Sequence, residues 1–274
     1  MPELPEVETV KESLKLKLIG KKIKSVNILW DNIIAYPNKE EFAREIGNKT
    51  ITDIKRRGKF LMFDLDDYYL LSHLRMEGKY FFKNNSDEIN KHEHVIFNLG
   101  DNEELRYMDT RKFGKMYLIK KDEIDNIGPL KELGLEPWDD NLNNEYLLDK
   151  YKNKKLPIKS VLLDQSIIVG IGNIYADEIL FLSRINPLKA SNLINEKECN
   201  DIIKYTRVVL EKAIKMGGST IRTYSSVDGV HGLFQNELLV HGKNKGNCPI
   251  CNENIDKIRV GGRGTYYCPK CQKM

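Results

Sequence analysis

The sequence predicts an α+β protein with more than one domain. Its 274 residues exceed what one compact core usually takes. Three patterns follow one another: an amphipathic helix at the start, short alternating apolar runs between about residues 21 and 120, and long helical patterns from about 145 to 216. Hydrophobic residues make up 41% of the chain, which is enough for real cores and argues against wholesale disorder.

The first helix is predicted over residues 5–18. Pro5 suits its first turn, where the missing N–H group is not needed, and Gly20 suits its end. Between these positions apolar residues recur at helical spacing, at Val7, Val10, Leu14 and Leu18. An amphipathic helix therefore begins almost at the first residue.

The region from about residue 21 to 120 has the pattern of short strands. Its apolar runs alternate and are separated by Asn, Asp and Gly clusters, which is typical of an antiparallel sandwich or barrel. The runs are KSVNILW, KFLMFDL, YYLLSHL, HVIFNLG and KMYLI.

The polar stretch WDDNLNNEY, which follows Pro137, indicates a domain boundary. Helical patterns follow it, among them IYADEILFLSRI and the segment 200–215. We therefore expect a first domain over 1–137, a helical domain over 138–240 and a cysteine-containing segment over 241–274.

Positive charge is concentrated near the end of the chain. The formal net charge is +4, but residues 241–274 alone carry seven Lys or Arg against two Asp or Glu. A second concentration is Lys55, Arg56, Arg57 and Lys59. Clustered positive charge on an otherwise nearly neutral chain favours a polyanionic partner, although many such clusters are only solvated faces.

No apolar run approaches the roughly 18 residues that a membrane span requires. The N-terminus has neither the basic start nor the apolar core of a secretory signal. We therefore expect a cytoplasmic protein that makes no use of a membrane.

The cysteines predict a metal site. Cys248 and Cys251 form one CxxC pair, and Cys268 and Cys271 form a second, sixteen residues later. This spacing is typical of four thiolates around one structural zinc ion, whereas a pair of disulfides would need an oxidising compartment. The fifth cysteine, Cys199, falls in a helical pattern and is expected to be a packing residue.

Pro2 is a candidate nucleophile. If Met1 is removed, Pro2 presents a secondary amine whose α-amino pKa is about 8, so an appreciable fraction can attack an electrophilic carbon such as C1′ of a sugar. Glu3 and Glu6, one helical turn apart, could supply a general acid and hold a water. The alternative is purely structural, because Pro and acidic residues both favour a helix start.

Other candidates lie at turns. Asn173 ends the turn VGIGN and is expected to cap a helix whose N–H groups suit a phosphate. Arg259 and Arg263 fall in KIRVGGRGTYYC, which has the pattern of a hairpin that could hold a phosphate or be a solvated turn. His92 and His94 lack a visible cysteine or carboxylate partner for a metal, so phosphate contacts or surface positions are favoured.

Taken together, these residues resemble the bacterial formamidopyrimidine-DNA glycosylases. The resemblance runs in order along essentially the whole chain, ending in the four-cysteine finger. Its segments are PELPEVET, RRGKFL, SHLRMEG, KHEHV, RYMDTRKFG and LLDQSIIVGIGNIYADE.

The resemblance implies an N-terminal β-sandwich preceded by the helix bearing Pro2, and a helical domain with a helix–two-turns–helix motif and a zinc finger. It also implies an enzyme that excises oxidised purines from double-stranded DNA and cleaves the strand by β- and δ-elimination. Pro2 would form a Schiff base at C1′, with Glu3 as the acid. Lys59 would donate the proton of the β-elimination, and Arg263 would serve the δ-elimination and grip a phosphate.

The same resemblance implies DNA contacts. An enzyme that acts on C1′ must extrude the nucleotide and fill the hole left behind. Met76 would fill that void, Phe113 would wedge the step and Arg111 would bond the orphaned cytosine, although core packing is the alternative for Met76 and Phe113. Backbone contacts are expected from His73, His92, Lys154 and Asn173. The loop 222–235 would cover the extruded purine, and the enzyme is expected to be a monomer.

Each of three alternative functions predicts a sequence feature that differs from this chain. The endonuclease VIII-like branch prefers oxidised pyrimidines and typically opens PEGPE, whereas this chain opens PELPE. A zinc-ribbon DNA-binding protein without chemistry would have no use for Pro2. A tautomerase with an N-terminal proline would be much shorter and would have no use for the finger.

Overall fold

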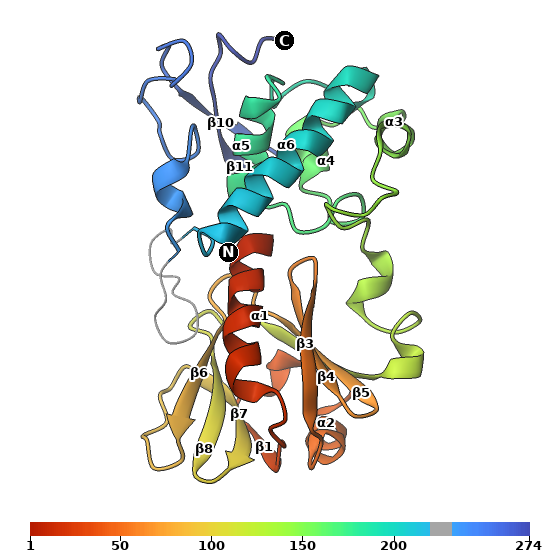
Figure 1. Cartoon of the computed structure of the whole chain (residues 1–274), viewed down its shortest axis with the longest axis vertical. Coiled ribbons are helices and arrows are strands. Elements are labelled where there is room, and N and C mark those ends of the chain that lie inside the picture. The colour runs from red at the N-terminus through yellow and green to blue at the C-terminus, as the bar shows by residue number, and fades with distance from the viewer. Residues whose placement is uncertain (220–231) are drawn as a thin grey trace. The chain divides into compact units, whose positions relative to one another are not determined.

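The computed structural model describes residues 1–219 and 232–274 and divides into two compact units. The first unit comprises residues 1–131 with 217–232, and the second comprises 132–216 with 233–274. Figure 1 shows the helices and strands of both. No helix among the described residues is long and apolar enough to cross a bilayer.

The first unit is a helix followed by strands in two sheets. The helices are α1 (Leu4–Leu18), a short 3-10 helix (Asp31–Ile33), α2 (Lys39–Ile46) and a second 3-10 helix (Lys121–Glu123). The strands are β1 (Ser25–Ile28), β2 (Ile34–Tyr36), β3 (Ile51–Arg57), β4 (Phe60–Leu65), β5 (Tyr68–His73), β6 (Lys79–Asn84), β7 (Glu93–Gly100), β8 (Glu103–Met108) and β9 (Lys115–Lys120).

The strand pattern allows a sandwich or a barrel, and the two sheets form a sandwich. One has the order β1-β7-β8-β6 and the other the order β2-β9-β5-β4-β3. All pairs are antiparallel except β2 with β9, which is parallel, so the expectation of a wholly antiparallel arrangement is wrong at this edge. About 80 residues separate these two strands, so no hairpin dictates their direction.

One hydrophobic core joins both sheets and the first helix. Val7, Val10 and Leu14 of α1 are all at most 1% exposed, and α1 runs alongside β3 (Figure 1). Across the core, the rings of Phe63 on β4 and Tyr80 on β6 lie 5.7 Å apart in an edge-to-face arrangement. The predicted helix over 5–18 is confirmed, and its apolar face is the face that is buried.

Helix α2 was not foreseen among the strands. Its start signal is present in the sequence, because Asn38 is the N-cap and its side chain accepts the backbone N–H of Glu41 at 2.9 Å. Phe42 and Ile46 are its buried residues. Only eight residues form the helix, which leaves little periodicity to recognise.

The second unit is helical and ends in a small hairpin. It contains α3 (Asn144–Tyr151), α4 (Ile158–Leu162), α5 (Asn173–Leu182), α6 (Glu196–Lys215), and the strands β10 (Asp256–Val260) and β11 (Arg263–Tyr267). Short 3-10 helices lie at Ser191–Leu193 and Phe234–Glu237, and another, Pro129–Glu132, spans the boundary between the units. Helix α5 packs against α6 and β11, and seven of its ten residues are buried. The helical region and the hairpin are therefore confirmed.

The hydroxyl of Tyr107 packs between two glycines of the first unit. A Cβ atom added at Gly78 or at Gly114 would overlap this hydroxyl. Gly78 ends the loop that follows β5, and Gly114 ends the loop that follows β8. Both loops can therefore approach the same buried tyrosine only because these two positions carry no side chain.

We predict that Gly114→Ala destabilises the first unit by about 1–3 kcal/mol, because the added methyl group overpacks the Tyr107 contact. Urea unfolding measures this change. Gly47→Ala is the matched control, since a Cβ atom there would sit 3.4 Å from the nearest backbone oxygen, which is ordinary contact. Equal free energies of unfolding for the two variants would contradict the prediction.

Candidate active site

The chain begins in a hydrogen-bonded turn at the start of α1. Pro2 is buried, and Glu3, which is 3% exposed, is the N-cap of the helix. Glu3 and Glu6 form a capping box, in which Oε2 of Glu6 accepts the backbone N–H of Glu3 at 2.8 Å. The box fixes the backbone that immediately follows Pro2.

The second oxygen of Glu6 holds another segment of the first unit. Oε1 of Glu6 accepts the backbone N–H of Ser219 at 2.7 Å and its hydroxyl at 3.1 Å. Gly218 permits this approach, because its φ is +77° and a Cβ atom would lie 2.7 Å from that oxygen. Both oxygens of Glu6 thus serve as acceptors of structural hydrogen bonds, so its geometry indicates positioning rather than proton transfer.

Lys59 lies in the turn between β3 and β4 and is 7% exposed. Arg56 ties this turn to the first helix: its Nη1 donates to the carbonyl of Gly58 at 2.9 Å and its Nε to Oε2 of Glu8 at 2.7 Å. Burial opposes ionisation of Glu8, but hydrogen bonds from Lys11 and Arg56 prevail and hold its pKa below the ordinary value. The turn with Lys59 is therefore anchored to the helix that follows Pro2.

His73 ends β5 beside this turn. It pairs with Phe60 across the strands, with ring centroids 4.6 Å apart, and its Nδ1 accepts the backbone N–H of Arg75 at 2.9 Å. Burial, with the nearby charges of Arg75 and Lys59, lowers the pKa of His73 to about 3. The imidazole is thus neutral, and because Nδ1 accepts, Nε2 carries the proton and can donate it. The structure brings Lys59 and His73 together.

A buried carboxylate, which the sequence reasoning missed, shapes the loop after β8. The carboxylate of Asp109 accepts the backbone N–H groups of Arg111, Phe113 and Gly114 at 3.0, 2.9 and 2.8 Å. Asp109 is fully buried, whereas Phe113 is 49% exposed. An Asp two residues before a turn position is a recognisable signal for such a loop.

The side chains that this loop presents do not belong to the core. Arg111 is exposed and its guanidinium carbon lies 4.7 Å from the ring centroid of Phe113. Met76, in the loop after β5, is 37% exposed. Core packing is therefore wrong for Met76 and Phe113, and an exposed apolar pair needs another explanation.

The start of the chain and these loops line one open groove of the first unit. Its volume is about 600 Å³. Most of the side chains that line it are cationic or apolar: Met1, Trp30, Asn32, Arg75, Met76, Arg111, Lys112, Phe113 and Lys115. The groove suits a ligand that is both anionic and flat, because it offers guanidinium and ammonium groups beside exposed apolar surface.

The His92–Glu93–His94 run is structural in large part. The carbonyl of His92 accepts the backbone N–H of Asp109 at 2.9 Å, and Nε2 of His94 donates to the carbonyl of Asp109 at 2.8 Å. Glu93 forms a buried ion pair with Arg106 at 3.0 Å. His92 alone keeps a partly exposed side chain, next to the loop with Phe113.

In the second unit, Asn173 does not cap its helix. Helix α5 begins at Asn173, and the N-cap is Gly172, so the expected cap is wrong. The Asn173 side chain reaches the hairpin instead, where its Nδ2 donates to the carbonyl of Gly264 at 3.0 Å. The sequence alone did not reveal this use, because it joins residues 91 positions apart.

The hairpin presents Arg263 at its turn. Gly261 and Gly262, with φ of +54° and +77°, form the two-residue turn between β10 and β11. Arg263 is exposed as the first residue of β11, next to the carbonyl that Asn173 bonds. Lys154 lies after α3, with its Nζ 3.8 Å from a carboxylate oxygen of Asp164. The structure thus brings Arg263 and Asn173 together within this unit.

The structure describes only part of the segment between α6 and the cysteines. Most of the loop 222–235 lies outside the described residues, which resume at 232. Ahead of the cysteines, the buried carboxylate of Glu178 accepts the backbone N–H groups of Leu239, Val240 and His241 at 2.8, 3.0 and 2.8 Å. Burial raises the pKa of Glu178.

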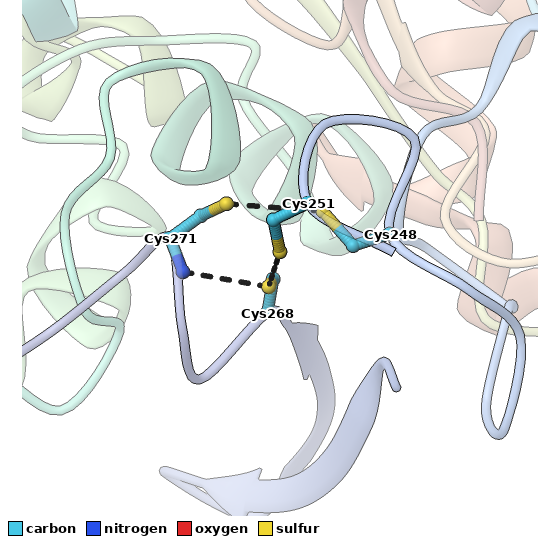
Figure 2. Close-up of side chains that lie close together, drawn as sticks. All are labelled: Cys248, Cys251, Cys268 and Cys271. Carbon is cyan, nitrogen blue, oxygen red and sulfur yellow. Dashed lines mark hydrogen bonds between the residues drawn. The ribbon is translucent and has the colours of Figure 1, made fainter. Parts of the chain in front are cut away.

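The four paired cysteines fit one zinc ion. Among residues 1–219 and 232–274 they form the only group of metal-ligating side chains, with all ligand atoms within 4.8 Å of one another. Figure 2 shows the sulfurs converging, and two of the Sγ–Sγ distances are 3.8 and 3.5 Å. A tetrahedron with Zn–S bonds of about 2.3 Å has edges of about 3.8 Å. All four are free thiols, which excludes the disulfide alternative, and Cys199 is buried elsewhere.

Comparisons with known proteins cover almost the whole chain. Three family models match: formamidopyrimidine-DNA glycosylase N-terminal domain over 1–116, formamidopyrimidine-DNA glycosylase H2TH domain over 133–225, and a zinc finger found in FPG and IleRS over 247–273. Formamidopyrimidine-DNA glycosylase of Oceanobacillus iheyensis is 47% identical over 99% of this chain and 98% of that protein.

Solved structures agree with these relatives. A mutant Lactococcus lactis FPG in complex with a Fapy-dG containing DNA is similar, with a TM-score of 0.93, 40% identity and coverage of 100% of both chains. The complex of Lactococcus lactis Fpg with an abasic site containing DNA has the same TM-score and identity, and covers 99% of this chain and 100% of that one.

The neutral state of His73 predicts a pH dependence of stability. A histidine has a pKa of about 6.5 in an unfolded chain, whereas here it is about 3, so unfolding between these pH values takes up a proton. The free energy of unfolding should therefore fall as the pH drops below about 6.5, by about 1.4 kcal/mol per pH unit from this group. Urea unfolding at several pH values checks it, with His73→Gln showing a shallower slope.

His92→Gln is the control for that measurement, since it removes a partly exposed histidine of the same unit. If His73→Gln and the unaltered chain lost stability equally as the pH falls, the assignment of a neutral imidazole to His73 would be wrong.

The cysteine geometry predicts one zinc ion per chain. Cys268→Ser should lose that zinc and unfold the segment around β10 and β11, because structural zinc contributes about 10–16 kcal/mol to such segments. The first unit should remain folded. Metal analysis and limited proteolysis measure both effects, and Cys199→Ser, at a buried cysteine outside the cluster, is the control. Full zinc content in Cys268→Ser would refute the assignment.

Proposed function

The chain belongs to the formamidopyrimidine-DNA glycosylase family, and we propose that it excises oxidised purines, such as 8-oxoguanine and formamidopyrimidines, from double-stranded DNA and then cleaves the strand. One observation of the structure carries the proposal. The start of the chain lines the same groove as Met76, Arg111 and Phe113. A nucleophile at that start and side chains able to replace a base are therefore neighbours.

The proposed first step is base removal by Pro2. Without Met1, the amine of Pro2 attacks C1′ of the damaged nucleotide, and the electron pair of the glycosidic bond leaves with the base, which takes up a proton. Glu3 acts as the acid that assists this loss and protonates the ring oxygen of the sugar, so that the sugar opens and an iminium remains on C1′. The capping box supports this role, since it fixes the backbone between the two residues.

Strand cleavage follows from the iminium, which acidifies the protons on C2′. Loss of one such proton breaks the C3′–O3′ bond in the β-elimination, and we assign the accompanying proton donation to Lys59. A second elimination breaks the C5′–O5′ bond, and we assign Arg263 to this step and to the phosphate. Burial of Lys59 beside the neutral His73 supports a specific rather than a solvating role for this lysine.

Three of the DNA contacts are assigned on exposure and chemistry. Met76 fills the space of the extruded nucleotide, Phe113 wedges the base step and Arg111 bonds the orphaned cytosine. Phosphate contacts are assigned to four other residues: His73, His92, Lys154 and Asn173. The exposure of Met76 and Phe113 supports these roles, because an apolar wedge must be free to enter the stack.

The zinc ion has a structural part in this proposal, since four thiolates leave no open coordination position.

We further propose that the enzyme is a monomer in the bacterial cytoplasm, associated with the nucleoid when it binds DNA. The domain limits 1–137, 138–240 and 241–274 stay predictions, as does the covering role of the loop 222–235.

Borohydride trapping tests the proposed chemistry. We expect a covalent adduct at Pro2, located by mass spectrometry, on a duplex with 8-oxoguanine opposite cytosine, because borohydride reduces the iminium to a stable amine. Pro2→Gly should reduce trapping on the order of 100-fold or more, with little change in affinity for the duplex.

A second duplex, with thymine glycol, separates the related functions. Preferential trapping on it would place the chain with the pyrimidine branch. No adduct from a protein whose first residue is confirmed as Pro2 would refute the covalent mechanism and leave a DNA-binding protein.

A further inference from the structure

A buried ion pair of the second unit has no part in the proposed chemistry. Lys159 on α4 and Asp177 on α5 are both fully buried, with Nζ and Oδ1 2.7 Å apart. Replacing such a pair by apolar residues is often neutral or stabilising, because the removal of two charges from water offsets their attraction. Stability alone therefore does not explain this pair.

Both side chains hold the backbone of the hairpin strand β11. Nζ of Lys159 donates to Oγ1 of Thr265 at 2.8 Å and to the carbonyl of Gly264 at 3.2 Å. Oδ2 of Asp177 accepts the backbone N–H of Tyr266 at 3.2 Å. The pair thus contacts three consecutive residues of one strand, which fixes the strand along its own axis.

Two further contacts complete this arrangement. The hydroxyl of Thr265 donates to the carbonyl of Arg263 at 3.1 Å, so a chain of hydrogen bonds runs from Asp177 through Lys159 to the backbone of Arg263. Nδ1 of His241 lies 2.7 Å from the same Oδ2 of Asp177. The carboxylate is therefore surrounded by defined partners rather than by mobile water.

One carbonyl links this arrangement to the DNA contacts. The carbonyl oxygen of Gly264 accepts hydrogen bonds from both Nζ of Lys159 and Nδ2 of Asn173. Asn173 lies four residues before Asp177, on the same face of α5, and Gly264 follows Arg263 directly. A slip of β11 by one residue would turn Arg263 to the opposite face of the hairpin and remove the acceptor of Asn173.

We propose that Lys159 and Asp177 are positioning residues that hold Arg263 and Asn173 at one phosphate of the DNA. The inference rests on the proposed phosphate contacts of those two residues. The pair acts through the backbone of β11 and does not itself touch the substrate. Its charges set the register of an exposed arginine rather than add stability.

The test removes both charges at once, since removal of one alone would leave an unpaired buried charge and could unfold the chain. The variant Lys159→Met/Asp177→Asn keeps a neutral acceptor for His241 and for the N–H of Tyr266. We expect it to fold and retain zinc, yet to bind a duplex with a stable abasic-site analogue about tenfold more weakly than the unaltered chain. The matched control is Lys197→Met/Asp201→Asn, which removes a pair at the surface of the same unit and should not change binding.

A double-mutant cycle shows whether the pair acts through Arg263. Arg263→Gln should also weaken binding, by about tenfold at most, and its combination with the charge-free variant should bind no more weakly than the charge-free variant alone, because that variant already removes the contact of Arg263. Unchanged binding by the charge-free variant, or losses that multiply, would overturn the inference. Unchanged binding by Arg263→Gln would overturn it as well. Trapping at Pro2, measured separately, decides the proposed chemistry in each case.

Discussion

Buried carboxylates that accept backbone N–H groups are the constraint on which the candidate site depends. Loop segments leave such groups without the partners that helices and sheets provide, and an unpaired buried N–H is costly. A carboxylate has several acceptor positions, so one side chain can satisfy two or three of them. Glu6, Asp109 and Glu178, each at most 6% exposed, do this for the segments near Ser219, Phe113 and His241.

Because of this constraint, buried residues orient the loops, and exposed residues carry the proposed DNA contacts. Side chains assigned to touch DNA, such as Met76, Phe113 and Arg263, are exposed at turns. The groups that orient them, Asp109 and Lys159 among them, are buried and bonded to backbone. An exposed arginine or aromatic side chain loses less entropy on binding when its backbone has only one conformation. Rigid loops therefore favour recognition without adding any contact to the ligand.

The sequence predicted the parts of the molecule that depend on local pattern. The helix over 5–18, the four-cysteine site and the hairpin with Arg263 follow from periodicity, CxxC spacing and a Gly-Gly turn. It did not predict the parts that depend on distant partners. Asn173 bonds a carbonyl 91 residues away instead of capping its helix, and Asp109 looks like an ordinary loop residue until its three N–H donors are seen.

The two acids at the start of the chain show why position alone does not define a role. Glu3 and Glu6 are one turn apart, are both buried, and both stabilise the start of α1. The two carboxylate oxygens of Glu6 accept hydrogen bonds from Glu3 and Ser219. Removal of the Glu6 side chain would therefore release two segments, and its effect on activity would resemble the loss of a catalytic acid. Glu3 adjoins Pro2, and an acid must be held in place before it can transfer a proton. The helix-capping and catalytic interpretations of Glu3 are therefore compatible, because the cap supplies the order that the chemistry requires.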